Sequence, residues 1–139
     1  MNWIGLLAFS LLTLLGKSLT PQDFVWEYRL LIITEVDFLG QDWSLDGKKT
    51  DLEDRRLLVF VLSDGKLIQS NCKESIDIPS FLRFAQATQA RDESPNWVLV
   101  GLDGGKKSWG RGVPNLEDIF RKIDAMPMRQ SEIRKRGNG

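Results

Sequence analysis

The chain has 139 residues, enough for one domain with a single core. Its 19 acidic and 19 basic side chains cancel, so no overall field would attract nucleic acid, and we expect no nucleic-acid partner. It has no histidine and one cysteine, which excludes histidine-assisted nucleophiles, a CxxC redox pair, an intramolecular disulfide and a cysteine zinc site. The composition therefore gives no reason to expect a metal or a cofactor.

The N-terminal segment has the composition of a secretory signal peptide. Residues 3–16 form an apolar run that Lys17 follows. The run is shorter than the roughly 20 apolar residues that span a membrane, and Gly16 and Ser18 supply the small side chains of a cleavage site. We therefore predict a signal peptide over residues 1–18, a secreted or periplasmic protein, and no stable membrane span after cleavage. No basic residue precedes the run, so an uncleaved membrane anchor and, third, a buried first helix stay open.

Two uniformly apolar segments predict the centre of a sheet. The first lies within residues 29–36 and the second covers residues 57–62. Strands that are apolar at every position are typical of parallel sheets covered on both faces. Residues 37–56 between them are long enough for a crossover connection, in which we expect one short helix.

The polar stretch after the second strand contains the only cysteine. Residues 66–77 lack clear periodicity, and Cys72 lies among them. A lone cysteine in an exported protein is either a buried apolar side chain or a free thiol, and burial is the more frequent outcome. Pro79 then opens a helix with apolar residues at helical spacing, which we expect to run to about Gln89 or Ala90.

The last part of the chain predicts a β-hairpin followed by two helices. An apolar strand over residues 97–102 and a short polar strand over residues 106–109 flank an Asp-Gly-Gly turn. Asn115 is a natural N-cap for an amphipathic helix, which should stop or kink just before Pro127. A second helix over residues 128–136 follows, with basic residues at its end.

The order of these elements is strand, crossover, strand, helix, strand, strand, helix. A right-handed crossover makes the first two strands parallel, and a tight turn makes the last two antiparallel. We predict an α/β, thioredoxin-like fold over residues 21–137, with a central mixed four-stranded sheet (β-α-β-α-β-β-α) and helices on both faces. Other arrangements of four mixed strands share this order and stay open.

Three segments carry a resemblance to a known family. They are Trp-Glu-Tyr-Arg-Leu-Leu at 26–31, Val-Gly-Leu-Asp-Gly-Gly-Lys at 100–106, and Ile-Asp-Ala-Met-Pro-Met-Arg at 123–129 with Glu132, Arg134 and Gly137 after it. From about Pro21 to Gly137 the chain resembles a family of secreted bacterial domains of unknown function, the bacterial counterpart of the DUDES domain of extracellular matrix proteins. The resemblance implies a thioredoxin-like fold, distantly similar to the peroxiredoxins.

Cys72 is the one candidate for the redox chemistry that this resemblance implies. Thioredoxin and peroxiredoxin chemistry needs a thiolate just after the first core strand, where a helix N-terminus lowers its pKa. Residues 36–40, Val-Asp-Phe-Leu-Gly, stand there and contain no cysteine. Cys72 follows the second strand, and because this is the same end of a parallel pair, we expect it near that active edge. It has no resolving partner and no cysteine motif, so an inert thiol is the favoured interpretation.

Other polar and aromatic groups match known sites poorly. The acidic residues of the crossover are Asp37, Asp42, Asp46, Asp51, Glu53 and Asp54. Their spacing is not that of a calcium loop, and the glycines near the hairpin follow turn geometry rather than that of a phosphate loop. Trp43, Trp97 and Trp109 could form a carbohydrate or peptide platform, and the basic C-terminal residues could touch an anionic partner. Core packing and solvation are the more frequent explanations.

The leading hypothesis is an exported domain without redox catalysis. It would act as a binding or structural module for an unknown protein or for a ligand in the periplasm or outside the cell. The alternative is a peroxiredoxin-like oxidoreductase that uses Cys72 in an atypical position or with a thiol from a partner. A third hypothesis, which applies if the N-terminal run is retained, is a membrane-anchored accessory protein.

Overall fold

A five-stranded sheet and its helices make up the part of the chain that the computed structural model describes, residues 17–37, 43–87 and 95–138. The strands are β1 (Arg29–Thr34), β2 (Leu57–Ser63), β3 (Lys66–Ser70), β4 (Trp97–Val100) and β5 (Lys106–Gly110). The helices are the 3-10 helix η1 (Pro21–Phe24), α2 (Lys49–Asp54), α3 (Ile78–Gln86), α4 (Leu116–Asp124) and α5 (Pro127–Asn138). Residues 1–16 of the predicted signal peptide lie outside the described residues.

The two apolar segments form the parallel pair at the centre of the sheet, as predicted. The sheet has the order β3-β2-β1-β4-β5, and the register of β1 with β2 runs from Arg29 opposite Leu57 to Thr34 opposite Leu62. β4 lies antiparallel to β1, and β5 antiparallel to β4. Every residue of β1 is buried, which is why its sequence shows no polar alternation. The predicted short helix of the crossover is confirmed as α2.

The prediction of four strands is wrong, because part of the stretch read as irregular forms a fifth strand, β3. Asp64 and Gly65 have φ of 51° and 70°. Positive φ at both central residues is the geometry of a tight two-residue hairpin, and here it turns Ser63 back to Lys66. β3 lies at the edge of the sheet with exposed or half-buried residues. The sequence therefore lacks the apolar run that marks the central strands.

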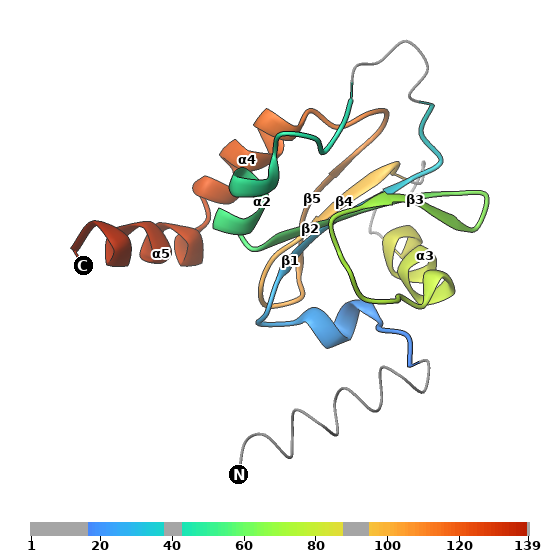
Figure 1. The fold of residues 1–139 in the computed structure, drawn as a ribbon, viewed down its shortest axis with the longest axis horizontal. Helices are drawn as coiled ribbons and strands as arrows, with labels where there is room; N and C mark the ends of the chain where they lie inside the picture. Colours follow the sequence, from blue (N-terminus) through green and yellow to red (C-terminus); the bar gives the residue numbers. More distant parts are fainter. Residues whose placement is uncertain (1–16, 38–42, 88–94, 139) are drawn as a thin grey trace.

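The sheet has a buried core on each face, and helices cover both, as predicted. The core against α2 and α4 contains Leu31, Ile33, Leu52, Leu57, Val59, Val61, Leu99, Leu116, Ile119, Phe120 and Ile123. The core against η1 and α3 contains Phe24, Leu30, Ile32, Leu58, Phe60, Leu62, Phe81, Ala85, Val98 and Val100. Successive side chains of a strand point to opposite faces, so each central strand serves both cores. Figure 1 shows α2 and α4 on one side of the sheet and α3 on the other.

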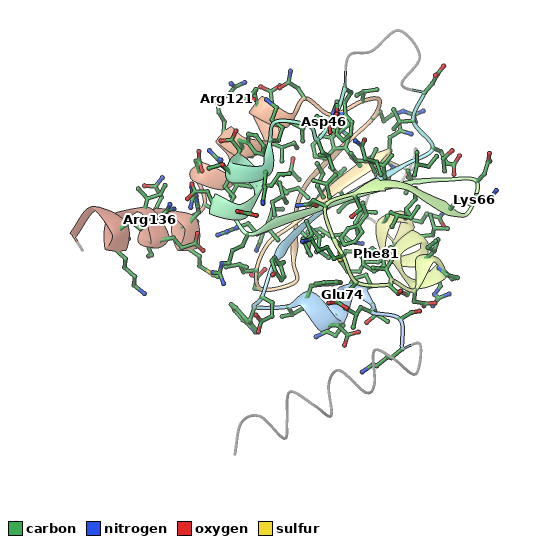
Figure 2. All side chains as sticks on the ribbon, viewed as in Figure 1. Asp46, Lys66, Glu74, Phe81, Arg121 and Arg136 are labelled. Atoms are coloured by element: carbon green, nitrogen blue, oxygen red, sulfur yellow. The ribbon has the colours of Figure 1, made fainter. Side chains whose placement is uncertain are left out.

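Both edge strands carry a β-bulge and a lysine. The register of β2 with β3 shifts so that Ile68 has no opposite residue, and the register of β4 with β5 shifts so that Lys107 has none. Lys66 and Lys106 begin the two edge strands, and Figure 2 shows Lys66 at the tip of the β2–β3 hairpin. Bulges and lysines on edge strands oppose pairing with another chain. The long outer edges of this sheet are therefore poor templates for a further strand.

The C-terminal helices follow the predicted break at Pro127. Asn115 caps α4 as predicted, because its Oδ1 accepts the backbone N–H of Asp118 at 3.0 Å. α5 then runs from Pro127 to Asn138, past the predicted end at Arg136, and projects away from the sheet (Figure 1). No helix among the described residues combines the length and the apolar composition that crossing a membrane requires.

Candidate functional site: the Cys72 pocket at the sheet edge

A cavity of about 710 Å³ lies beside the first half of β2. Pairing between β2 and β3 ends at Phe60 and Ser70, so none of the described strands lies on the outer side of residues 57–59. α2 lines the cavity on one side, and residues 69–74 line it on the other. Figure 2 shows two of its lining residues, Asp46 and Glu74, on opposite sides of the sheet. The cavity therefore wraps around an open stretch of sheet edge.

The cavity has an apolar floor and a charged rim. The apolar residues that line it are Phe24, Tyr28, Leu45, Leu52, Leu57 and Leu58. The charged residues are Lys49, Arg56 and Lys73 against Asp46, Glu53 and Glu74. Because three cations face three anions, the lining carries no net charge. Such a cavity suits an uncharged or zwitterionic ligand with apolar groups better than a polyanion.

Cys72 lies in this cavity with a half-buried side chain. Its Sγ is 3.7 Å from the carbonyl oxygen of Glu74. Burial raises the pKa of the thiol, and this effect exceeds the lowering by the hydrogen bond to the Glu74 backbone; the Glu74 carboxylate adds a smaller rise. Reactive cysteines have a lowered pKa, usually from a neighbouring cation or a helix N-terminus. The setting of Cys72 keeps it a protonated thiol at neutral pH.

The structure places Cys72 beside the first residues of β2, at the end of the sheet opposite to the one that we expected. The neighbouring Asn71 contacts Leu57, which begins β2, whereas the predicted active edge lies at the carboxyl ends of β1 and β2. The expectation that Cys72 lies near that edge is wrong. The physical reason is the β2–β3 hairpin, which carries the chain back along the sheet before it reaches Cys72.

Asn96 occupies the carboxyl end of β1, where redox chemistry of the thioredoxin type would need its thiolate. Its side-chain nitrogen donates to the carbonyl oxygens of Thr34 at 3.2 Å and Glu35 at 3.4 Å. Its side-chain oxygen accepts the N–H of Gly112 at 2.7 Å. Residues 38–40 of the predicted active segment lie outside the described residues. The amide of Asn96 thus ties the end of β1 to the segment after β5.

Asn71 fills the place of the missing strand at the open edge of β2. Its side-chain oxygen accepts the backbone N–H of Val59 at 2.7 Å, and its side-chain nitrogen donates to the carbonyl oxygen of Leu57 at 2.9 Å. The hydroxyl of Ser70 donates to the carbonyl oxygen of Val59 at 2.5 Å. These three bonds satisfy backbone groups that a neighbouring strand would otherwise bind.

The predicted acidic set does not converge on one point. Asp51 pairs with Arg55 at 3.4 Å, and Asp54 pairs with Arg129 at 2.7 Å. Asp46 lines the cavity, and Asp42 lies outside the described residues. Among the residues that the structure describes, no group of three or more acidic or cysteine side chains is placed to hold a metal ion.

The three predicted tryptophans do not form a common platform. The indole N–H of Trp43 donates to the carbonyl oxygen of Pro114 at 2.9 Å, and Trp43 and Trp97 both pack against the α4 core. Trp109 on edge strand β5 is 42% exposed. Sequence reasoning overlooked Trp26, which is 61% exposed and has φ of 70°. Packing in the core accounts for Trp43 and Trp97, and packing at the edge of the sheet accounts for Trp109.

An arginine–carboxylate network under α5 also escaped the sequence reasoning, which treated Arg129 as part of a solvated basic end. Arg129 is only 3% exposed. Its guanidinium donates to the carboxylates of Asp54 at 2.7 Å, Asp124 at 3.0 Å and Glu132 at 3.4 Å. It also donates to the backbone carbonyl of Asp54 at 2.9 Å. α5 is therefore attached to α2 and α4 through a buried cation.

Glu132 connects this network to the first strand. Arg29 is 1% exposed and donates to Glu132 at 3.3 Å and to the carbonyl oxygen of Arg55 at 2.8 Å. Arg56 donates to Glu132 at 2.9 Å. Arg29 belongs to one of the segments that carry the family resemblance, and Arg129 and Glu132 belong to another. Those two segments meet in this network. Their arginines are the feature of the sequence from which the network could have been predicted.

Comparison with known proteins identifies one family. The sequence model of the family described as Domain of unknown function (DUF4174) matches residues 20–132. The matched part contains every strand of the sheet, the Cys72 pocket and the residues of the network up to Glu132. Neither a curated protein nor a solved structure matches the chain significantly.

Proposed function

This chain belongs to the family described as Domain of unknown function (DUF4174), and from that premise we propose that it is an exported binding or structural module without redox catalysis. Its place of action is the periplasm or the outside of the cell. The composition of residues 1–18 supports export. The ligand or partner binds at the pocket beside β2, which has an apolar floor and a charged rim.

A thioredoxin-like architecture related to the DUDES domain is part of this proposal. Parallel β1 and β2, an antiparallel β4–β5 hairpin and helices on both faces support it. In this interpretation β3 is an addition at the edge of the four central strands. The fold was kept while its usual chemistry was not, and fold alone does not imply function.

The observation that carries the absence of redox catalysis is the setting of Cys72. Burial raises the pKa of its thiol, whereas thiol catalysis needs a thiolate at neutral pH. It is the only cysteine of the chain, so no resolving cysteine exists within the molecule. It also lies at the end of the sheet opposite to the place where the fold would position a catalytic thiol.

A thiol assay on the protein without residues 1–18 tests this proposal. We expect no peroxide consumption above that of Cys72→Ser, and alkylation of Cys72 by iodoacetamide at pH 7.5 several-fold slower than in the same protein unfolded in urea. The unfolded sample is the matched control, because it exposes the same thiol without its surroundings. Peroxide turnover that disappears in Cys72→Ser would reject the proposal in favour of a peroxiredoxin-like oxidoreductase.

Export is tested separately by expression of the full chain in a bacterial host. We expect N-terminal sequencing of the periplasmic fraction to begin directly after Ser18, because Gly16 and Ser18 have the side chains of a cleavage site. A matched variant with Ser18→Arg should accumulate uncleaved. Exported protein that still begins at Met1 would contradict cleavage and favour the membrane-anchored alternative.

A further inference from the structure

The first half of β2 has a gap in its outer side, where the side chain of Asn71 binds Leu57 and Val59 and the hydroxyl of Ser70 binds the carbonyl oxygen of Val59. Resting on the proposed role as a binding module, we propose that a short extended peptide segment of a partner protein binds here as an added strand. The peptide displaces the side chain of Asn71 and takes over its hydrogen bonds to Leu57 and Val59. The pocket beside β2 then receives the side chains of the peptide.

The hydrogen bonds of Asn71 define what the gap recognises. A primary amide offers one acceptor and a two-proton donor, and a peptide backbone offers the same two kinds of group. In Asn71 the acceptor binds the N–H of Val59 and the donor binds the carbonyl oxygen of Leu57. A peptide that replaces Asn71 restores both bonds, while the freed amide is solvated, so the exchange leaves no buried polar group unsatisfied.

The cavity gives such a peptide room on both faces of the sheet. Its volume of about 710 Å³ lies in the range of roughly 300 to 1,000 Å³ that is usual for ligand pockets. Side chains of an extended segment alternate between the two faces. On one face they meet Leu52 and Leu57, and on the other they meet Phe24 and Leu58. Apolar residues at consecutive positions of the peptide are therefore accommodated.

Charge and length restrict the partner further. The lining carries three cations and three anions, which complements an uncharged peptide and disfavours nucleic acid or another polyanion. The gap covers residues 57–59, which corresponds to about 10 Å of extended chain at 3.3 Å per residue. Beyond it, β3 closes the edge with its bulge at Ile68 and with Lys66. The partner segment is therefore short, and long strands are excluded.

Titration of a ¹⁵N-labelled protein with a synthetic peptide tests the inference. The protein is the Cys72→Ser variant of residues 19–139, so that no thiol chemistry contributes. The probe is acetyl-Thr-Val-Val-Val-Thr-amide, which places apolar side chains on both faces. Its control is the same peptide with all three valine nitrogens methylated, so that these nitrogens cannot donate hydrogen bonds. We expect the probe to shift the backbone amide signal of Val59 and the side-chain amide signals of Asn71. We expect the methylated peptide to bind at least tenfold more weakly, because strand addition depends on backbone N–H groups.

Two variants distinguish a peptide that displaces the side chain of Asn71 from a peptide that only contacts it. Asn71→Ala removes the competing amide, so we expect the probe to bind several-fold more tightly. Gln86→Ala changes an exposed side chain of α3 that does not line this cavity, and it should leave affinity within twofold. Hydrogen exchange of the Val59 backbone amide can be measured with Asn71 intact. We expect the probe to slow this exchange.

Three results would overturn the inference. One is the absence of any change at Val59 at millimolar probe, and another is equal binding of the methylated peptide. The third is a concentration-dependent shift of Val59 without peptide, together with sedimentation as a dimer, which would assign the gap to a second copy of the chain. Failure of the peptide with an unreactive Cys72 rejects this inference alone, whereas thiol-dependent peroxide turnover rejects the proposed function.

Discussion

Replacement of Arg129 by alanine is expected to lower the free energy of unfolding by about 3 kcal/mol, the lower end of the range for breaking a buried ion pair. The change leaves three carboxylates, those of Asp54, Asp124 and Glu132, without their shared guanidinium. They keep partial access to water, which is why the lower end applies. Urea unfolding followed by circular dichroism measures the loss, and the slope with urea should stay unchanged.

Matched variants on α5 define the origin of this loss. Arg134→Ala removes an exposed guanidinium that donates to the hydroxyl of Ser131 at 3.2 Å, and it should change stability by less than about 0.5 kcal/mol. Arg129→Lys keeps the charge without the planar fork and should recover part of the loss. The double variant with Glu132→Gln should lose less than the sum of the single losses, since the two residues share one network. A loss below about 1 kcal/mol for Arg129→Ala would contradict the anchoring role of this side chain.

The free energy of unfolding is expected to fall steeply as the pH drops below about 5, because carboxylates of the network titrate at lower pH in the folded than in the unfolded state. Hydrogen bonds from Arg136 and Arg129 lower the pKa of Asp54. Burial by itself would raise the pKa of Glu132, but hydrogen bonds led by that of Arg56 bring it below its usual value. Unfolded carboxyls titrate near about 3.9 for Asp and 4.3 for Glu. The stabilisation is therefore complete above these values and is lost as the pH falls through the lowered ones.

Urea unfolding at several pH values between 7 and 2.5 measures this dependence. The Asp54→Asn variant is the control, because it removes one titrating group of the network, and its stability should change less steeply between pH 5 and 3. Truncation after Asp124 offers a second comparison, because it removes Arg129, Glu132 and Arg136 together. Equal slopes for the parent protein and Asp54→Asn would contradict the assignment of the acid sensitivity to this network.

The central strands could be predicted from the sequence because burial on both faces leaves a direct mark in it. β1 is polar only at its two ends, Arg29 and Thr34, and β2 only at its last residue, Ser63. Every other position of the two strands is apolar. The cap at Asn115 and the break at Pro127 were predictable for a local reason, since each depends on bonds within one helix turn. β3 was missed because an edge strand needs no apolar face, and its exposed and half-buried residues show no run like those of β1 and β2.

The error at the candidate site follows from that missed strand. Cys72 was correctly identified as the only available thiol, but its position depends on the direction in which the hairpin carries the chain. The network was missed for a different reason. Arg129 and Asp54 are 75 residues apart, and in sequence each is an ordinary charged residue of a helix. Arg129 becomes buried only when α5 packs against α2.

The contact between Arg29 and Glu132 also has a consequence for how the chain folds while it is being made. These residues are 103 positions apart, and a chain that leaves the ribosome with its N-terminus first presents Arg29 long before Glu132 follows. Until then β1 cannot be buried without leaving a guanidinium that lacks its carboxylate partner, which is costly. The domain therefore reaches its folded state only after nearly the whole chain has emerged. A nascent chain that still lacks Glu132 thus remains unfolded.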